Sequence, residues 1–149
     1  MPGVEYAVWA PERSGVRVRV GGEDHEMCRD ETGWWRADVP ERGDYAFILD
    51  GEDRPLPDPR SRWQPDGVHG ASRPYDHARF EWTDQLWTGR SLPGSVIYEL
   101  HVGTFTDGGT FDHAIERLDH LAELGVDLVE VMPVNAVDAP RNWGYDGVL

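Results

Sequence analysis

The sequence predicts a chain of more than one domain: a small all-β sandwich, followed by the first strand, helix and strand of a parallel sheet. Three observations carry this prediction. Short stretches of alternating apolar and polar residues fill the first third of the chain, a proline-rich segment without periodicity follows at residues 50–76, and a helical apolar pattern lies between two apolar runs in the last third. A length of 149 residues suits a small domain with part of another.

The first part of the chain is predicted to form short antiparallel strands. Val16, Val18 and Val20 alternate with arginines, which places the valines on one face of a half-buried strand. Gly21-Gly22 tolerates the positive φ angles of a tight hairpin, and a short strand around residues 25–28 is expected to follow. Further strands are expected at Glu5 to Ala10, Trp34 to Val39 and Tyr45 to Leu49. Strands at this spacing, with no helical period between them, are typical of a β-sandwich.

Residues 50–76 break this pattern. Five prolines lie in the segment, so we expect no strand ladder to run through it. Loops in compact proteins seldom exceed about 12 to 15 residues, and a longer one is usually functional or packed against a neighbour. We therefore expect a β-domain over residues 1–85 that includes this loop, a connector over 86–94, and a second domain over 95–149.

The second domain begins with an apolar run from Val96 to Phe105, which predicts a strand buried on both faces of a parallel sheet. A helix is expected next, capped by Thr110 or Asp112 and ended by Gly125. Its apolar face has helical spacing and comprises Phe111, Ala114, Ile115, Leu118, Leu121 and Ala122. A second strand is expected from Asp127 to Met132. Together these elements form one βαβ unit with a right-handed crossover.

The charge balance argues against several classes of partner. All 14 basic residues are arginines and 28 residues are acidic, which gives a formal net charge of −14. Such a surface repels phosphate backbones and anionic lipids, so we expect no nucleic-acid or membrane partner. No apolar run is long enough for a bilayer and no secretory signal is recognisable, so a cytoplasmic location is expected. Cys28 is the single cysteine, and the six histidines show no metal-ligand spacing.

The loop after the second strand contains the candidate binding residues. It runs through the sequence NWGYDG at residues 142–147, where Trp143 and Tyr145 offer aromatic faces and Asp146 a carboxylate. Chemistry in parallel sheets lies outside the carboxyl ends of the strands. Aromatic faces beside polar groups suit a sugar, because its apolar ring face stacks and its hydroxyls form hydrogen bonds. The alternative is that the two rings only hold the loop in place.

Two further groups of residues have both a structural and a functional interpretation. Trp34 and Trp35 are adjacent on a strand, so one is expected in the core, and the other is either a sugar-stacking surface or covered by a neighbouring domain. Glu99, His101 and Glu130 could do acid–base work. We favour a structural role for them, because they are expected within the strands and not at the carboxyl ends.

Two sets of motifs resemble known glycosidases. The sequence VIYELHVGTFT at residues 96–106, with the segments 118–127 and 130–134, is similar to the opening of the α-amylase-type glycosidase barrel. A sharper match is LPDPRSRWQPDGVHG at residues 56–70 together with the loop 142–147. This pairing resembles the malto-oligosyltrehalose trehalohydrolase family, and the likeness covers essentially the whole chain.

The resemblance implies an immunoglobulin-like sandwich of the carbohydrate-binding-module type, followed by a (β/α)8 TIM barrel of which this chain holds the first βαβ unit. The family cleaves the α-1,4 bond next to the terminal trehalose of maltooligosyl trehalose and releases trehalose. Its superfamily uses carboxylates after barrel strands four, five and seven, so no catalytic residue is assigned in this chain, which is expected to be inactive alone. No metal or organic cofactor is implied.

The resemblance also assigns substrate-binding residues. Tyr145 matches the tyrosine that stacks on the sugar at the cleavage site, and Trp143 and Asp146 are expected beside it. The expected partner is maltooligosyl trehalose or another α-glucan oligosaccharide. Two alternatives stay open, a fragment of a glycogen-branching or debranching enzyme and a stand-alone α-glucan-binding module.

Overall fold

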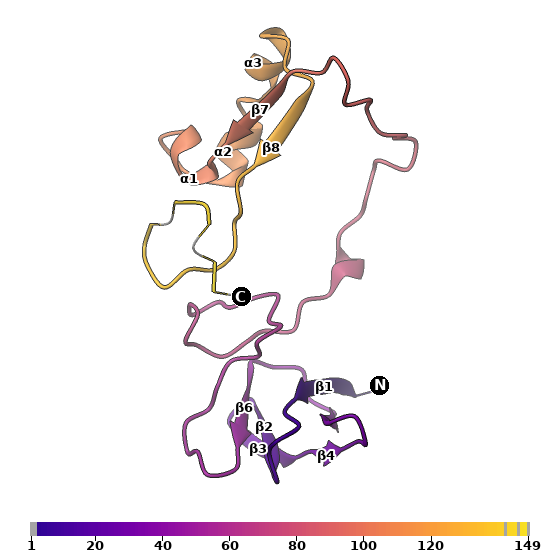
Figure 1. Cartoon of the computed structure of the whole chain (residues 1–149), viewed down its shortest axis with the longest axis vertical. Coiled ribbons are helices and arrows are strands. Elements are labelled where there is room, and N and C mark those ends of the chain that lie inside the picture. Colours follow the sequence, from indigo (N-terminus) through magenta and orange to yellow (C-terminus); the bar gives the residue numbers. More distant parts are fainter. Residues whose placement is uncertain (1–2, 142, 146, 149) are drawn as a thin grey trace. The chain divides into compact units, whose positions relative to one another are not determined.

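A computed structural model of the chain describes residues 3–141, 143–145 and 147–148. These residues form two compact units, named here unit 1, up to residue 77, and unit 2, from residue 78 to residue 148 (Figure 1). The division expected from the sequence remains a prediction, with a β-domain over residues 1–85, a connector over 86–94 and a second domain over 95–149. None of the helices in the described residues has the length and apolar character needed to cross a membrane.

Unit 1 consists of two three-stranded antiparallel sheets, with the strand orders β1-β5-β4 and β3-β2-β6 (Figure 1). The strands are β1 Val4–Trp9, β2 Val16–Val20, β3 Glu23–Glu26, β4 Cys28–Arg29, β5 Trp34–Val39 and β6 Tyr45–Leu49. The predictions for β2, β5 and β6 are confirmed residue for residue, and β1 begins and ends one residue earlier than predicted.

One hydrophobic core lies between the two sheets. The three valines of β2 are at most 1% exposed, and they cluster with Tyr6 and Val8 of β1 and Phe47 of β6. Trp35 of β5 belongs to the same cluster, whereas Trp34 points to the opposite face, as strand alternation requires. Burying one large apolar side chain contributes about 1.5 to 3 kcal/mol, so this cluster is the main source of stability in unit 1.

The hairpin between β2 and β3 is confirmed. Gly21 and Gly22 have φ angles of 58° and 97°. Val20 pairs with Glu23, so the two glycines are the whole turn. Two consecutive positive φ angles are the geometry of a two-residue hairpin, and glycine adopts it without steric cost.

The single strand predicted around residues 25–28 is wrong, because this segment crosses from one sheet to the other. His25 pairs with β2 in the second sheet, and Cys28 pairs with β5 in the first sheet. Met27 lies between them, is buried in the common core, and donates its backbone N–H to the carbonyl of Val16 at 3.1 Å. Burial of the Met27 side chain therefore separates β3 from β4.

The long loop of residues 50–76 packs along β6. Leu56 and Ser72 each form a pair of backbone hydrogen bonds with β6, at Phe47 and Tyr45 respectively, all at 2.8 Å. These are isolated bridges, which agrees with the expectation that no ladder runs through the segment. Asp58 is buried and accepts the Tyr45 hydroxyl at 2.7 Å, and its backbone N–H donates to the Ser72 hydroxyl at 3.0 Å.

A surface ion pair holds the end of the same loop. The Arg73 guanidinium donates to both carboxylate oxygens of Asp44, at 2.5 and 2.7 Å. This bidentate hydrogen bond lowers the pKa of the Asp44 carboxyl below its ordinary value of 3.8. The pair joins the residue before β6 to the residue after Ser72.

Unit 2 contains a parallel pair of strands, β7 Ile97–Leu100 and β8 Leu128–Val131. Asp127 sets their register, since its carboxylate accepts the Val96 N–H at 3.0 Å and its own N–H donates to the Val96 carbonyl at 2.9 Å. The strand predicted from Val96 to Phe105 is too long. The chain turns at His101, and Val102–Phe105 forms the short helix α1. Within β7, Leu100 is the only buried residue, whereas burial on both faces was predicted.

The predicted helix after Gly109 is divided in two. Helices α2 Phe111–Ile115 and α3 Leu118–Glu123 are separated by a turn in which Arg117 donates its N–H to the carbonyl of Ala114. Of the six residues of the predicted apolar face, Ala114 and Leu121 are buried. The cap is confirmed at Thr110, whose hydroxyl accepts the N–H of His113, and Gly125 has the expected positive φ of 90°. A short 3₁₀ helix, η1 His77–Arg79, lies at the unit boundary.

Replacing Trp35 with alanine is expected to destabilise the protein by about 3 to 5 kcal/mol, because a large buried ring leaves a cavity in the common core. Trp34→Ala is the matched control, since this neighbour lies on the outer face and its loss should cost much less. Urea unfolding followed by circular dichroism measures both variants. Equal losses for the two variants would contradict the assignment of Trp35 to the core.

Replacing Asp44 with asparagine removes the bidentate ion pair while keeping the shape of the side chain. Because the pKa of Asp44 is lowered in the folded state, the pair stabilises the protein above pH 3.8 and this advantage is lost as the pH falls further. The effect should be small and should weaken with salt, since both side chains are partly exposed. The difference in melting temperature between wild type and Asp44→Asn should be larger at pH 7 than at pH 3.

Candidate functional site

The loop 132–148 is attached to the carboxyl ends of both strands of unit 2 through one glycine. His101 directly follows β7 and Met132 directly follows β8. Gly144 is buried against both of them: a Cβ atom at this position would lie 2.6 Å from Met132 Cε and 3.3 Å from His101 Cδ2. Its φ of 91° also favours glycine. Only a residue without a side chain fits here without strain.

The two legs of this loop are joined to each other as well. The N–H of Val148 donates to the carbonyl of Ala136 at 2.9 Å. Gly147 lies so close to Asn135 that a Cβ atom would stand 2.5 Å from Asn135 Cβ. The loop is therefore fastened at its base and again at the point where the chain returns.

Trp143 and Tyr145, on either side of Gly144, present their rings outward. Their exposed fractions are 74% and 69%. Neither ring is buried, so the attachment at Gly144, and not the aromatic rings, determines where the loop lies. Asp146, the third predicted binding residue, lies outside the described residues. The described part of the site thus offers two exposed aromatic side chains at the edge where parallel sheets hold their ligands.

His101 is placed differently from the prediction. It was expected within a strand, but β7 ends at Leu100, so His101 stands at the carboxyl end. Its backbone carbonyl accepts the N–H groups of Thr104 and Phe105 at 3.0 and 2.9 Å and so begins α1. Its ring lies between Gly103 and Gly144. Gly103 and Gly144 are the sequence signal for this position of His101, because two residues without side chains leave room for its imidazole ring.

Glu99 and Glu130 are register partners on β7 and β8. Both are exposed, so the prediction that they are buried structural charges is wrong. Within the described residues neither forms an ion pair with a cation. Two like charges side by side on one face repel each other, and this face of the strand pair is therefore not stabilised by its charged residues.

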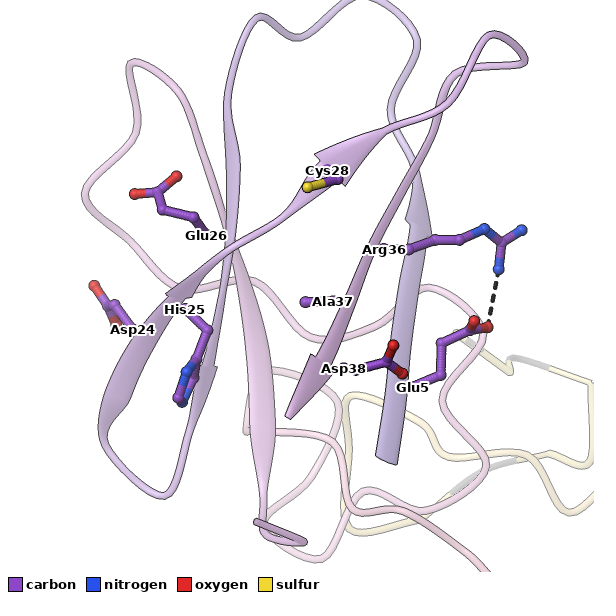
Figure 2. A pocket seen from close by; sticks show the side chains of 8 residues that line it. All are labelled: Glu5, Asp24, His25, Glu26, Cys28, Arg36, Ala37 and Asp38. Carbon is purple, nitrogen blue, oxygen red and sulfur yellow. Dashed lines mark hydrogen bonds and ion pairs between the residues drawn. The ribbon is translucent and has the colours of Figure 1, made fainter. Parts of the chain in front are cut away.

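The described residues hold no group of three or more His, Cys, Asp or Glu side chains that could bind a metal ion. Unit 1 has an acidic groove, drawn in Figure 2. Its one ion pair among the labelled residues joins Arg36 and Glu5 at 2.9 Å. The groove is lined by Glu5, Asp24, His25, Glu26, Cys28, Arg36, Ala37 and Asp38.

The chain is similar to characterised carbohydrate enzymes. It is 51% identical to the malto-oligosyltrehalose trehalohydrolase of Rhizobium sp. over 96% of its length, and 52% identical to that of Mycobacterium tuberculosis over 97%. The 1,4-alpha-glucan branching enzyme of Bacillus subtilis is 30% identical over 97% of this chain, and the match covers 27% of that enzyme. No family model matches the chain.

Solved structures agree with these matches. A Salmonella typhimurium protein named as an alpha amylase superposes with a TM-score of 0.91 and 41% identity, covering 99% of this chain and 26% of that one. A pullulanase from Anoxybacillus sp. in complex with maltotriose has a TM-score of 0.76 at 24% identity, covering 96% of this chain and 26% of that one, and supports the fold alone.

The chain spans about a quarter of the length of these relatives, 26% for both trehalohydrolases. The match covers 96% and 97% of the chain. The resemblance is thereby confirmed: this chain is similar along nearly its whole length to malto-oligosyltrehalose trehalohydrolases, and its fold is that of α-amylase-family enzymes.

Proposed function

We propose that this chain is part of a glycoside hydrolase that cleaves the α-1,4 bond next to the terminal trehalose of maltooligosyl trehalose, releasing trehalose as a step of its biosynthesis. Two observations together support the proposal. The chain is 51% identical to the trehalohydrolase of Rhizobium sp., and Trp143 and Tyr145 are exposed at the strand ends. Carboxylates and water suffice for glycoside hydrolysis, so no cofactor is required. A cytoplasmic location is part of the proposal.

The proposed role of the loop 132–148 is to hold the substrate. Tyr145 stacks on a sugar ring at the cleavage site, because a planar aromatic ring shields the apolar face of the sugar from water. Trp143 and Asp146 lie beside the substrate. Gly144 supports this role, since its contacts with His101 and Met132 keep the two aromatic residues at the carboxyl ends of the strands.

We further propose that unit 1 is an immunoglobulin-like sandwich of the carbohydrate-binding-module type and that unit 2 contains the first βαβ unit of a (β/α)8 barrel. Two antiparallel sheets around one core support the first assignment. A parallel strand pair with helices between its strands supports the second. In such a barrel the residues after each strand face the active site. The contacts of Gly144 with His101 and Met132 support this position for Trp143 and Tyr145.

The purified 149-residue chain is expected to release no trehalose. Hydrolysis by a retaining glycosidase needs two carboxylates about 5 to 5.5 Å apart on a rigid frame. The family resemblance places these groups after later barrel strands, and the described residues contain one pair of parallel strands. Incubation with maltotriosyl trehalose and chromatography of the products tests this. Trehalose formed in proportion to the amount of chain would contradict it.

Activity is testable in a chimera in which this chain replaces the matching quarter of the Rhizobium sp. trehalohydrolase. We expect the chimera to release trehalose from maltotriosyl trehalose, because the identical residues preserve the fit to the rest of the enzyme. The corresponding segment of the Bacillus subtilis branching enzyme is the matched control. If the chimera releases no trehalose, while this chain placed in the same way in the branching enzyme supports the formation of α-1,6 branches from amylose, the branching-enzyme alternative is favoured.

Within that chimera, Tyr145→Ala is expected to lower kcat/KM by about 10- to 100-fold, which corresponds to roughly 1.4 to 2.8 kcal/mol of lost stacking in the transition state. Tyr145→Phe keeps the ring and should retain most of the activity. Gly144→Ala should lower kcat/KM with both rings still present, because an added side chain moves the loop away from Met132. Unchanged kinetics in Tyr145→Ala would remove Tyr145 from the substrate-binding residues.

A further inference from the structure

We infer that residues 80–92, named here segment 80–92, form a docking segment that binds an apolar surface on the part of the parent enzyme outside this chain. The inference rests on the proposed function, because it needs a parent enzyme of which this chain is about a quarter. It gives a role to aromatic residues that belong neither to a core nor to the loop 132–148.

Segment 80–92 presents five large apolar side chains to solvent. Each of them is more than half exposed, and they are Phe80, Trp82, Leu86, Trp87 and Leu92. The core of unit 2 consists of other residues, with Leu100, Val102 and Leu121 at its centre. Large apolar side chains that gather in one exposed stretch mark an interaction site.

The segment is attached at the amino ends of both strands of unit 2. The Arg90 guanidinium donates to the carboxylate of Asp127, which also accepts the Val96 N–H and so joins the starts of β7 and β8. The N–H of Ser95 donates to the Leu92 carbonyl at 3.1 Å and closes a turn directly before β7. Because Arg90 is paired within unit 2, the segment offers a partner apolar surface and not positive charge.

Local contacts position the aromatic side chains of the segment. Phe80 and Trp82 pack edge-to-face, with ring centres 4.8 Å apart, and the Gln85 amide donates to the Trp82 carbonyl. The N–H of Trp87 donates to the Asp84 carbonyl at 2.9 Å, which closes a turn. These contacts define the path of the backbone and leave the rings open, so a partner surface covers them at a small cost in conformational entropy.

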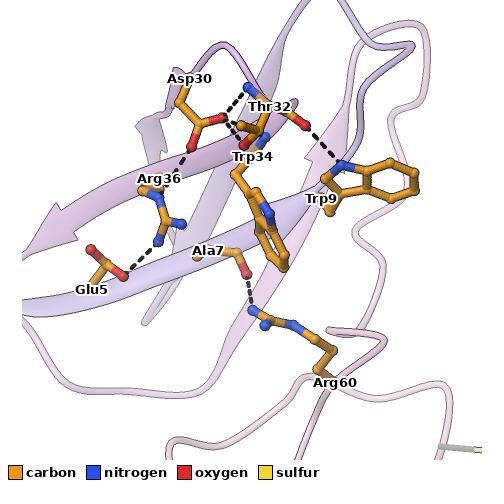
Figure 3. Close-up of polar contacts among 8 residues, drawn as sticks. All are labelled: Glu5, Ala7, Trp9, Asp30, Thr32, Trp34, Arg36 and Arg60. Atoms are coloured by element: carbon orange, nitrogen blue, oxygen red, sulfur yellow. Dashed lines mark hydrogen bonds and ion pairs between the residues drawn. The ribbon is translucent and has the colours of Figure 1, made fainter.

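Exposed tryptophans of unit 1 have a different kind of neighbour (Figure 3). The indole N–H of Trp9 donates to the Thr32 carbonyl at 3.1 Å, and the Arg60 guanidinium carbon lies 4.4 Å from the centre of a Trp34 ring. Polar groups of their own unit therefore contact Trp9 and Trp34. The neighbour of Trp82 is instead another apolar ring, which enlarges the apolar surface and favours an apolar partner.

The length of the relatives indicates what covers the segment. The chain spans 26% of each of two trehalohydrolases, so about three quarters of each lies outside it. In the described residues β7 and β8 have only each other as strand neighbours, and the proposed barrel closes only if that remaining part packs against unit 2. A second copy of this chain is disfavoured, because two surfaces with a formal net charge of −14 repel each other.

The test compares one introduced thiol in the 149-residue chain and in the chimera with the Rhizobium sp. enzyme. Leu86→Cys places it at the most exposed side chain of the segment, which is 95% exposed. We expect maleimide to label it at least about tenfold more slowly in the chimera, because it then reacts only when the interface opens. Cys28 is the matched control in the same molecule, since it is exposed on β4, and mass spectrometry of the peptides measures both rates.

A second set of variants tests the aromatic residues themselves. The double variant Trp82→Ser/Trp87→Ser should lower the melting temperature of the chimera and leave that of the 149-residue chain unchanged, because both rings are exposed in the chain alone. Thr88→Ser, an exposed polar residue of the same segment, should change neither temperature. An equal fall in the chain and in the chimera would assign the two tryptophans to the stability of unit 2 and overturn the inference.

Equal labelling rates in the chain and in the chimera also overturn it. If the rate in the chain alone is slow and falls with chain concentration, a second copy covers the segment. If it is slow at every concentration, another part of the chain does. Should the chimera not fold, the matching position of the intact Rhizobium sp. enzyme takes its place. Labelling requires a folded protein and no catalysis, so its outcome is distinguishable from a failure of the proposed trehalose release.

Discussion

The alternation of side chains between the two faces of each sheet determines which residues lie on the surface of unit 1. With the three valines of β2 facing inward, Tyr6, Val8 and Trp35 must face the same core from the opposite sheet. Because successive side chains of a strand point to opposite faces, Trp9 and Trp34 are then required to face outward. The same packing that stabilises the domain therefore places two tryptophans side by side on its exterior.

The long loop of residues 50–76 depends on β6 for its order. Its prolines exclude a ladder, and two isolated bridges with the buried Tyr45–Asp58–Ser72 hydrogen bonds take its place. Burial and the neighbouring Asp58 raise the pKa of the Tyr45 hydroxyl, so this hydroxyl stays protonated and keeps donating. Removing either partner would leave a buried polar group unsatisfied, which is more costly than the hydrogen bond itself is stabilising. These contacts attach the loop to β6 at three residues, Leu56, Asp58 and Ser72.

The sequence predicted those features that depend on local periodicity or on single residues. Strand alternation located β2, β5 and β6, and the glycine pair located the hairpin. Two predictions that depended on tertiary burial were wrong. The apolar run after Val96 indicates burial but not that the chain turns at His101, and helical spacing from 111 to 122 does not reveal the break at Arg117.

The candidate binding residues were predictable only in part. Trp143 and Tyr145 stand out by residue type. The role of Gly144 in positioning the loop depends on its contacts with His101 and Met132, which are distant in sequence. The pairing of Trp9 with Trp34 was not predicted, because Trp34 lies on a strand 25 positions later and only the register of β1 with β5 joins them.

Both aromatic surfaces share one physical requirement, namely that exposed rings are oriented by contacts that do not cover them. At Tyr145 and Trp143 the position of the backbone is fixed, because Gly144 between them is packed and lacks a side chain. Trp9 is oriented through its indole N–H, which the Thr32 carbonyl accepts while most of the ring stays open to solvent. At Trp9 the cost of ordering the ring is therefore met during folding.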